Sequence, residues 1–269
     1  MLESLSPARR RLVLAAVLGV LATVVLVAVV VARTTSQKVT PVGQDEPGPV
    51  LLVSGYGGST SSLEPLREAL EGAGRNVVVV PAVGGGTGDL EEQARALDDA
   101  AAAARARFGA ASVDVVGYSA GGVVARSWVR DHGGASVARR VLSVGSPQHG
   151  TSVAEAALGV AGSCPAACEQ LATDSDLLRG LNAGDETPRG PRFASVWSTA
   201  DRTVVPPESA RLAGGLDFTV QSVCPGSRTA HGDLPGDPVV LAALRSTLGR
   251  GAPEPPTDVT CWSVTRMPS

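Results

Sequence analysis

The chain has 269 residues, enough for one large domain with a sizeable hydrophobic core. Hydrophobic residues make up 43% of it and charged residues 18%, a balance that excludes an intrinsically disordered protein. Lys and Arg number 23 against 26 Asp and Glu, which gives a formal net charge of −3. This charge balance lacks the basic surplus of a nucleic-acid-binding protein, so we expect no nucleic-acid partner.

The N-terminal region contains one long apolar segment. Residues 12–32 carry no charge and consist of Leu, Val and Ala apart from Gly19 and Thr23. As a helix, these 21 residues would be about 31 Å long, close to the hydrocarbon thickness of a bilayer. Arg9–Arg11 precede the segment, so the positive-inside rule predicts a cytoplasmic N-terminus at residues 1–11 and an exported body.

Two interpretations of this segment compete. Its length favours an uncleaved transmembrane signal anchor, because the apolar core of a cleaved signal peptide usually has about 7–15 residues. Cleavage stays open, since Val30, Val31 and Ala32 form a small-residue sequence that a signal peptidase could use. We therefore expect a membrane-anchored protein with an extracellular body, or a secreted one if the segment is cleaved.

The four cysteines agree with export, because all of them follow the apolar segment and disulfides persist outside the cytoplasm. Cys164 and Cys168 are four residues apart, a spacing that brings two side chains together on a helical turn, so we expect them to pair. Cys224 and Cys261 are then left to join the C-terminal tail to the body. A zinc site is the weaker interpretation, since the spacing is not CxxC and no histidine lies nearby.

Beyond a polar linker at residues 33–48, apolar runs alternate with helical patterns. Short apolar runs, typical of buried parallel strands, lie at residues 50–53, 77–80, 113–116, 141–144, 194–197 and 218–220. Helical patterns begin at Ser61, which could form a capping box with Glu64, and at Asp89, and cover residues 120–131 and about 239–248. This alternation predicts one α/β domain at residues 49–249, with a mostly parallel central sheet flanked by helices.

Two further segments complete the predicted organisation. Residues 150–190 contain no clear strand, and we interpret them as an insertion and a candidate lid. Residues 250–269 are rich in Pro and are expected to form an extended C-terminal tail.

The most specific motif is Gly-Tyr-Ser-Ala-Gly-Gly at residues 117–122. It matches G-x-S-x-G and lies between a predicted strand and a predicted helix, where that motif forms a sharp turn with the serine at its apex. The turn would place the Ser119 hydroxyl at the carboxyl edge of the sheet, beside the positive end of a helix. Ser119 is therefore the predicted nucleophile.

A serine nucleophile needs a base, usually a histidine, and the chain has three histidines. His132 follows the predicted helix 120–131 and fits a surface position that interacts with the helix dipole. His149 follows the strand at residues 141–144 and precedes every candidate acid, contrary to the Ser…Asp/Glu…His order of this type of turn. His231 lies in a loop before the last helix and fits that order, so it is the predicted base, with His149 as the second candidate.

The base needs a carboxylate that orients it, and this residue should lie between Ser119 and His231 after a strand. Asp201 follows the strand at residues 194–197 and begins a short loop, so it is the predicted orienting acid. The remaining candidates are interpreted as surface charges: Asp174, Asp176, Asp185 and Asp217.

Stabilisation of a developing oxyanion requires backbone N–H donors near the nucleophile. One donor should be Ala120, the residue directly after Ser119. The other should come from the glycine-rich loop Ser54–Gly58, and the N–H of Tyr56 is the best candidate there.

Taken together, these segments resemble the α/β-hydrolase superfamily, and more closely the exported bacterial serine lipases and esterases of the class 2 lipase group. The resemblance extends from about Val50 to Leu248 and implies an α/β-hydrolase fold. It implies the same roles for Ser119, His231 and Asp201, and for Tyr56 and Ala120 as oxyanion donors. Many relatives begin the oxyanion loop with His-Gly, whereas this chain has Ser54–Gly55, so the side-chain support of that loop must differ.

The resemblance implies a serine hydrolase that cleaves carboxylic esters through an acyl-enzyme on Ser119 and needs no cofactor or metal. The expected substrate is a small-molecule or lipid ester. We expect the protein to contact the membrane only through its N-terminal segment. An acyltransferase that uses the same triad to acylate an envelope alcohol is the alternative. A dinucleotide-binding enzyme is excluded, because Thr60 replaces the third glycine of its fingerprint and Pro81, not an acid, follows the second strand.

Overall fold

The computed structural model describes residues 7–34 and 39–261. It divides into two compact units, Met1–Val39 and Thr40–Ser269, each of which is described by itself. Parts of the predicted cytoplasmic terminus (residues 1–6), linker (35–38) and C-terminal tail (262–269) lie outside the described residues.

In the described residues of the first unit, Pro7–Thr34 form the helix α1, which includes the anchor predicted at residues 12–32. The side chains of residues 12–13 and 26–32 lie outside the described part of the chain. Among the described residues, no helix combines the length and hydropathy needed to cross a membrane.

The second unit is built on six parallel strands in the order β2-β1-β3-β4-β5-β6. The strands are β1 (Val50–Val53), β2 (Val77–Val79), β3 (Val113–Tyr118), β4 (Ala138–Val144), β5 (Arg192–Trp197) and β6 (Leu216–Thr219). The helices are α2 (Glu64–Gly72), α3 (Leu90–Phe108), α4 (Ala120–Asp131), α5 (Ser152–Ala161), α6 (Ala166–Gln170), α7 (Asp176–Asn182), α8 (Val220–Val223) and α9 (Pro238–Leu248). The predicted parallel α/β domain is therefore confirmed.

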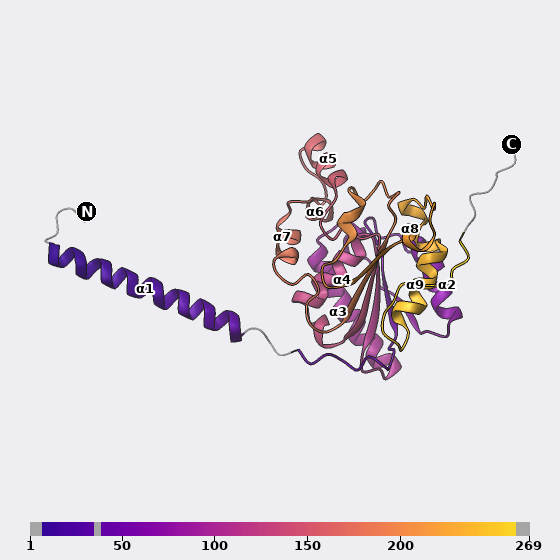
Figure 1. The fold of residues 1–269 in the computed structure, drawn as a ribbon, viewed down its shortest axis with the longest axis horizontal. Coiled ribbons are helices and arrows are strands. Elements are labelled where there is room, and N and C mark those ends of the chain that lie inside the picture. The colour runs from indigo at the N-terminus through magenta and orange to yellow at the C-terminus, as the bar shows by residue number, and fades with distance from the viewer. Residues whose placement is uncertain (1–6, 35–38, 262–269) are drawn as a thin grey trace. The chain divides into compact units, whose positions relative to one another are not determined.

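Helices cover both faces of the sheet, with α3 and α4 on one side and α2 and α9 on the other (Figure 1). Side chains of one strand alternate between the two resulting cores: Leu51 and Val53 pack toward α3 and α4, whereas Val50 and Leu52 pack toward α2 and α9. Because both faces are buried, β1 is a continuous apolar run and β3 is apolar apart from Asp114 and Gly117, the pattern on which their prediction rested.

The start of the second helix differs from the prediction. A 3-10 turn at Ser61–Leu63 precedes α2, and neither Thr60 nor Leu63 caps a helix with its side chain. The expected capping box is absent there because the Glu64 carboxylate instead accepts a hydrogen bond from Arg67 Nε at 2.9 Å. Asp89 does cap α3, where its Oδ1 accepts the N–H of Glu91 at 2.8 Å.

Residues 150–190, which we predicted to be an insertion, contain three helices, α5, α6 and α7, and no strand. Both predicted disulfides are present. Cys164 and Cys168 have Cα atoms 5.9 Å apart, and Cys224 and Cys261 have Cα atoms 5.5 Å apart. The second disulfide joins the segment after α8 to the C-terminal tail.

A buried charge network holds the amino edge of the sheet together. The Asp114 carboxylate on β3 is fully buried and accepts from Arg139 Nε at 2.9 Å and from Arg75 Nη2 at 2.6 Å. The same Arg139 guanidinium donates to the carbonyls of Leu248 and Gly249 at the end of α9. Strand β3, strand β4 and the last helix therefore share one electrostatic contact.

Replacing Asp114 should destabilise the domain strongly. Asp114→Ala leaves the buried Arg139 guanidinium without its counter-charge, and we expect a loss of about 3–5 kcal/mol in the free energy of unfolding. Urea denaturation followed by circular dichroism measures it. The control is Asp131→Ala, which removes an exposed partner of Arg130 and should change the free energy by less than about 1 kcal/mol. Equal effects of the two substitutions would contradict the assigned role of the network.

Candidate active site

Ser119 lies at the turn between β3 and α4 in an uncommon backbone conformation. Its φ is 53° and its ψ is −125°, and it is the one residue other than glycine with a positive φ among those described. Such a conformation is unfavourable for a side chain and persists only where the surroundings enforce it. Here the Ser119 N–H donates to the carbonyl of Val144 on β4 at 2.9 Å, which fixes the turn against the sheet.

The three glycines around Ser119 are required by close packing. A Cβ atom at Gly117 would lie 2.5 Å from the backbone of Gly121, and one at Gly121 would lie 2.3 Å from the carbonyl oxygen of Val53. A Cβ at Gly122 would lie 2.0 Å from Ser146 Oγ. Only residues without a side chain let α4 start this close to β1 and β4, so the motif provides the space that the turn needs.

The structure brings together the three residues that the sequence predicted as a triad. His231 Nε2 lies 3.0 Å from Ser119 Oγ, and His231 Nδ1 lies 2.6 Å from Asp201 Oδ2. The other carboxylate oxygen of Asp201 accepts the N–H groups of Thr203 at 2.7 Å and Val204 at 2.9 Å. Because the acceptor beside Nδ1 is a carboxylate, the ring proton belongs on Nδ1, which leaves Nε2 to accept the Ser119 proton.

Tyr118 was not predicted as a site residue, because it occupies the unspecified position before the serine in the G-x-S-x-G motif. Its hydroxyl donates to the carbonyl of His231 at 3.1 Å, and the two ring centroids are 5.3 Å apart. Burial and the nearby carboxylates of Asp201 and Asp233 raise the pKa of Tyr118 to about 12, so its hydroxyl stays protonated. Tyr118 therefore helps to hold the backbone of the His231 loop.

The other two histidines are not part of this arrangement. His149 Nε2 lies 3.0 Å from Glu186 Oε1, and its Nδ1 lies 3.2 Å from the carbonyl of Ser209. Burial would raise the pKa of Glu186, but the Ala213 N–H and His149 outweigh it and lower that pKa. His132 directly follows α4, and its N–H donates to the carbonyl of Trp128.

One of the acids interpreted as surface charges is partly buried. Both carboxylate oxygens of Asp217 accept the Leu212 N–H, at 3.2 and 3.1 Å, and burial raises the pKa of Asp217 to about 6. Its interpretation as an ordinary surface charge was wrong, because β6 begins two residues earlier than the apolar run indicated and includes Asp217. Asp176, in contrast, is exposed and pairs with Arg179.

The expected oxyanion donors lie beside the nucleophile. A Cβ atom at Gly55 would lie 3.4 Å from Ser119 Oγ, so the loop that contains Tyr56 passes directly next to the serine. The N–H of Gly57 donates to Gly86, which fixes this loop. Within residues 7–34 and 39–261, neither the Tyr56 N–H nor the Ala120 N–H has a protein acceptor, so both are available to a ligand oxygen.

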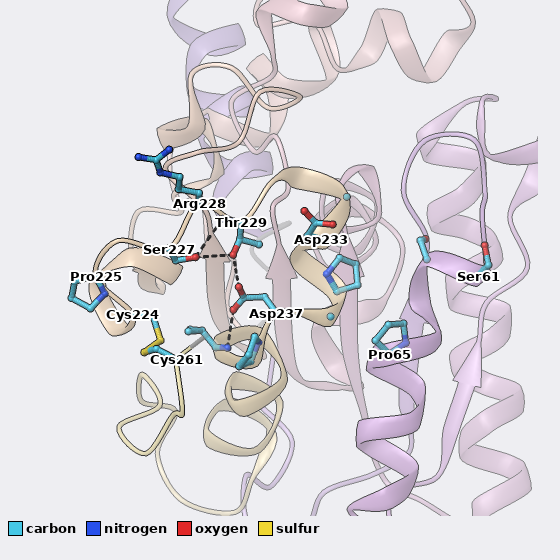
Figure 2. Close-up of a pocket in the computed structure, with 16 residues that line it drawn as sticks. Ser61, Pro65, Cys224, Pro225, Ser227, Arg228, Thr229, Asp233, Asp237 and Cys261 are labelled. Atoms are coloured by element: carbon cyan, nitrogen blue, oxygen red, sulfur yellow. Dashed lines mark hydrogen bonds between the residues drawn. A yellow bond between two sulfur atoms is a disulfide. The ribbon is translucent and has the colours of Figure 1, made fainter. Parts of the chain in front are cut away.

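Two cavities flank the loop that carries His231. One, of about 540 Å³, is lined by the Cys224–Cys261 disulfide and by Asp233 and Asp237 (Figure 2). There Thr229 Oγ1 donates to Asp237 Oδ2 at 2.5 Å, which ties the segment before His231 to the start of α9. The other cavity, of about 760 Å³, is lined by Asp201 and His231 themselves.

No metal site accompanies these groups in the described part of the chain, where no three His, Cys, Asp or Glu side chains gather closely enough to hold an ion. The chemistry that Ser119, His231 and Asp201 can perform in this arrangement is nucleophilic attack by a serine with an oriented histidine as base.

Comparison with solved structures places the chain in a known fold. Aspergillus fumigatus lipase B superposes with a TM-score of 0.67 at 19% identity, covering 79% of this chain and 56% of that one. Bacillus licheniformis lipase BlEst2 in its mature form gives 0.57 at 16% identity, covering 73% and 89%. A bromoperoxidase from Bacillus anthracis gives 0.50 at 15% identity, covering 72% and 87%. The chain has the α/β-hydrolase fold, and it spans little more than half the length of the Aspergillus protein.

Sequence comparison supports the narrower resemblance. The model of the class 2 lipase family matches residues 102–222, which include Ser119 and Asp201 and end before His231. No curated protein matches the chain. The predicted resemblance to α/β-hydrolases of the class 2 lipase group is thus confirmed.

The close packing at the Ser119 turn predicts opposite effects of two glycine substitutions on stability. Gly121→Ala forces a Cβ against the Val53 carbonyl and should lower the free energy of unfolding by about 2–3 kcal/mol. Gly159→Ala is the matched control, since Gly159 lies in α5 with no atom within 4 Å of the added Cβ and should gain up to about 1 kcal/mol in helix propensity. Thermal unfolding of both variants measures the effects, and stabilisation by Gly121→Ala would refute the packing argument.

Proposed function

We propose that the protein is an esterase of the lipase type that hydrolyses carboxylic esters with Ser119 as nucleophile, His231 as base and Asp201 as the orienting acid. The observation that carries this proposal is the continuous hydrogen-bond chain from Asp201 through His231 to Ser119. The match to the class 2 lipase family over residues 102–222 supports the same reaction class.

In the first half of the proposed reaction, Ser119 Oγ attacks the ester carbonyl carbon while His231 Nε2 takes the hydroxyl proton. The buried Asp201 carboxylate stabilises the imidazolium that forms. The carbonyl oxygen becomes an oxyanion, and the N–H groups of Tyr56 and Ala120 donate hydrogen bonds to it. The C–O bond to the alcohol then breaks, and His231 gives its proton to the leaving oxygen.

In the second half, water replaces the alcohol. His231 Nε2 accepts one proton of a water molecule whose oxygen attacks the acyl-enzyme carbonyl. Collapse of this intermediate breaks the bond to Ser119 Oγ, which recovers its proton from His231, and the carboxylic acid leaves. No observation favours transfer of the acyl group to an envelope alcohol, the alternative that the sequence left open.

A fluorophosphonate probe and two histidine variants test this assignment. Wild type should be labelled, and Ser119→Ala should abolish labelling and lower kcat for p-nitrophenyl butyrate by roughly 10⁴–10⁶-fold. His231→Ala should cause a loss of similar size, because it removes the base. His149→Ala is the control and should change kcat less than about tenfold, since His149 contacts Glu186 and not Ser119. Labelling that survives Ser119→Ala would falsify the proposed nucleophile.

We propose in addition that residues 12–32 anchor the protein in the membrane with the hydrolase domain outside the cytoplasm. The uncharged length of the segment and the preceding arginines support this location, and two disulfides suit an oxidising compartment. A cleaved signal peptide would export the same domain without an anchor.

Cell fractionation distinguishes these locations. The full chain should remain in the membrane pellet after alkaline carbonate extraction, and protease added to intact spheroplasts should digest the hydrolase domain. Replacing Leu21 and Val25 by Asp places two charges in the middle of the segment, at roughly 2.5–3.5 kcal/mol each, and should release the chain from the pellet. A soluble product whose N-terminus lies near residue 33 would instead establish cleavage.

A further inference from the structure

The cleft beside the proposed base carries an unusual charge. Its 760 Å³ is enclosed by the Asp201 loop on one side and the His231 loop on the other, and Arg202 and Arg228 lie on these two loops. Arg202 directly follows the acid of the triad, and Arg228 precedes its base by three residues. Two arginines thus line the space next to His231, and Arg228 lines the neighbouring 540 Å³ cavity as well.

Neither arginine has a structural role that would explain its place. Within residues 7–34 and 39–261, neither guanidinium makes a hydrogen bond or an ion pair, and both residues are exposed. Figure 2 shows the Arg228 side chain extending away from the carboxylates of Asp233 and Asp237. The buried arginines of this protein, in contrast, are bound to carboxylate or carbonyl oxygens.

The one carboxylate in the cleft does not neutralise these charges locally. Asp201 already accepts from His231 and from two backbone N–H groups. Its side chain is only 1% exposed, so an arginine that points into the cleft does not reach it. The accessible surface of the cleft therefore presents positive charge, which suits a carboxylate or phosphate because guanidinium groups bind both through paired N–H donors.

The position of the cleft indicates which part of an ester would occupy it. His231 must give its proton to the leaving alcohol, so the alcohol oxygen has to come within hydrogen-bond reach of Nε2. His231 lines this cleft together with the Asp201 loop, whereas Ser119 is not part of its wall. A substrate group that extends from Nε2 past His231 into this cleft therefore belongs to the alcohol and not to the acyl chain.

We propose that the Arg202–Arg228 cleft binds an anionic group, a carboxylate or a phosphate, carried by the alcohol part of the ester substrate. This inference rests on the proposed function and narrows its substrate class from carboxylic esters in general to esters of anionic alcohols. Neutral esters still react at Ser119, but they have no anionic group for Arg202 and Arg228 to bind.

Matched ester pairs test the proposal. The first pair is 4-acetoxybenzoate and its methyl ester, which share the acetyl group and differ in the charge of the alcohol part. The second pair is 1-butyryl-glycerol 3-phosphate and monobutyrin, which share the butyryl group and differ in a phosphate on the alcohol part. Each kcat/KM is divided by the rate of alkaline hydrolysis of the same ester, so that leaving-group reactivity cancels.

We expect wild type to prefer the anionic member of at least one pair, and the responding pair identifies carboxylate or phosphate as the group bound. Arg202→Gln and Arg228→Gln should each lower that preference about fivefold, and the double variant roughly 20-fold, with the neutral ester changed less than twofold. Because both arginines are exposed, 0.5 M KCl should also weaken the preference. Arg95→Gln, an exposed arginine on α3 outside the cleft, is the control for loss of one charge and should change neither member.

The outcomes separate this inference from the function on which it rests. If neither member of either pair is hydrolysed by a Ser119-dependent reaction, the proposed esterase activity itself fails. If neutral and anionic esters are both hydrolysed and the double variant leaves their ratio unchanged, the esterase stands and the anionic cleft is refuted. An equal loss with Arg95→Gln would assign the effect to net charge and not to the cleft, and would refute it as well.

Discussion

The site depends on one steric constraint, the close approach of α4 to strands β1 and β4. The helix begins so near the sheet that a Cβ atom has no room two residues before Ser119 or two and three residues after it, and glycine occupies these positions. This packing holds Ser119 at a φ of 53°, which a side chain does not adopt freely. Burial of the α4 face against the sheet stabilises the conformation, so the energy of the hydrophobic core keeps the half-buried Ser119 at the sheet edge.

The other groups of the site follow from the parallel sheet. Because β1, β3 and β5 run in the same direction, the loops after them open at one edge, and these loops carry Tyr56, Ser119 and Asp201. His231 arrives from farther along the chain and is placed by separate contacts, the Tyr118 hydroxyl behind its backbone and the Thr229–Asp237 bond beside it. The triad is thus assembled from strand ends that topology fixes and from one loop that hydrogen bonds fix.

The sequence predicted those parts of the fold that repeat a local pattern. The six strands, the helix at residues 120–131 and the cysteine pairs could be predicted because apolar runs, the G-x-S-x-G turn and a four-residue spacing have few alternative meanings. Ser119, Asp201 and His231 followed from motif and chain order. The predictions of a capping box at Ser61 and of a surface charge at Asp217 were wrong for another reason. Each residue's environment depends on a contact, Arg67 with Glu64 or the Leu212 N–H with Asp217, that no local sequence pattern indicates.

The same distinction explains why charge was the least predictable property of this chain. The net charge of −3 indicates nothing about Asp114, whose buried carboxylate binds two arginines far from it in sequence, or about Arg202 and Arg228, which have no partner within the described residues. Arg139, which is enclosed by acceptors, holds the amino edge of the sheet, whereas Arg202 and Arg228 lie at the cleft beside its carboxyl edge. An unpartnered cation pair costs little while it stays in water, but it becomes a source of selectivity once an anionic substrate displaces that water. An arginine that has carboxylate or carbonyl oxygens of the folded chain within hydrogen-bond distance therefore stabilises the fold. An arginine that has none is free to bind an anionic substrate.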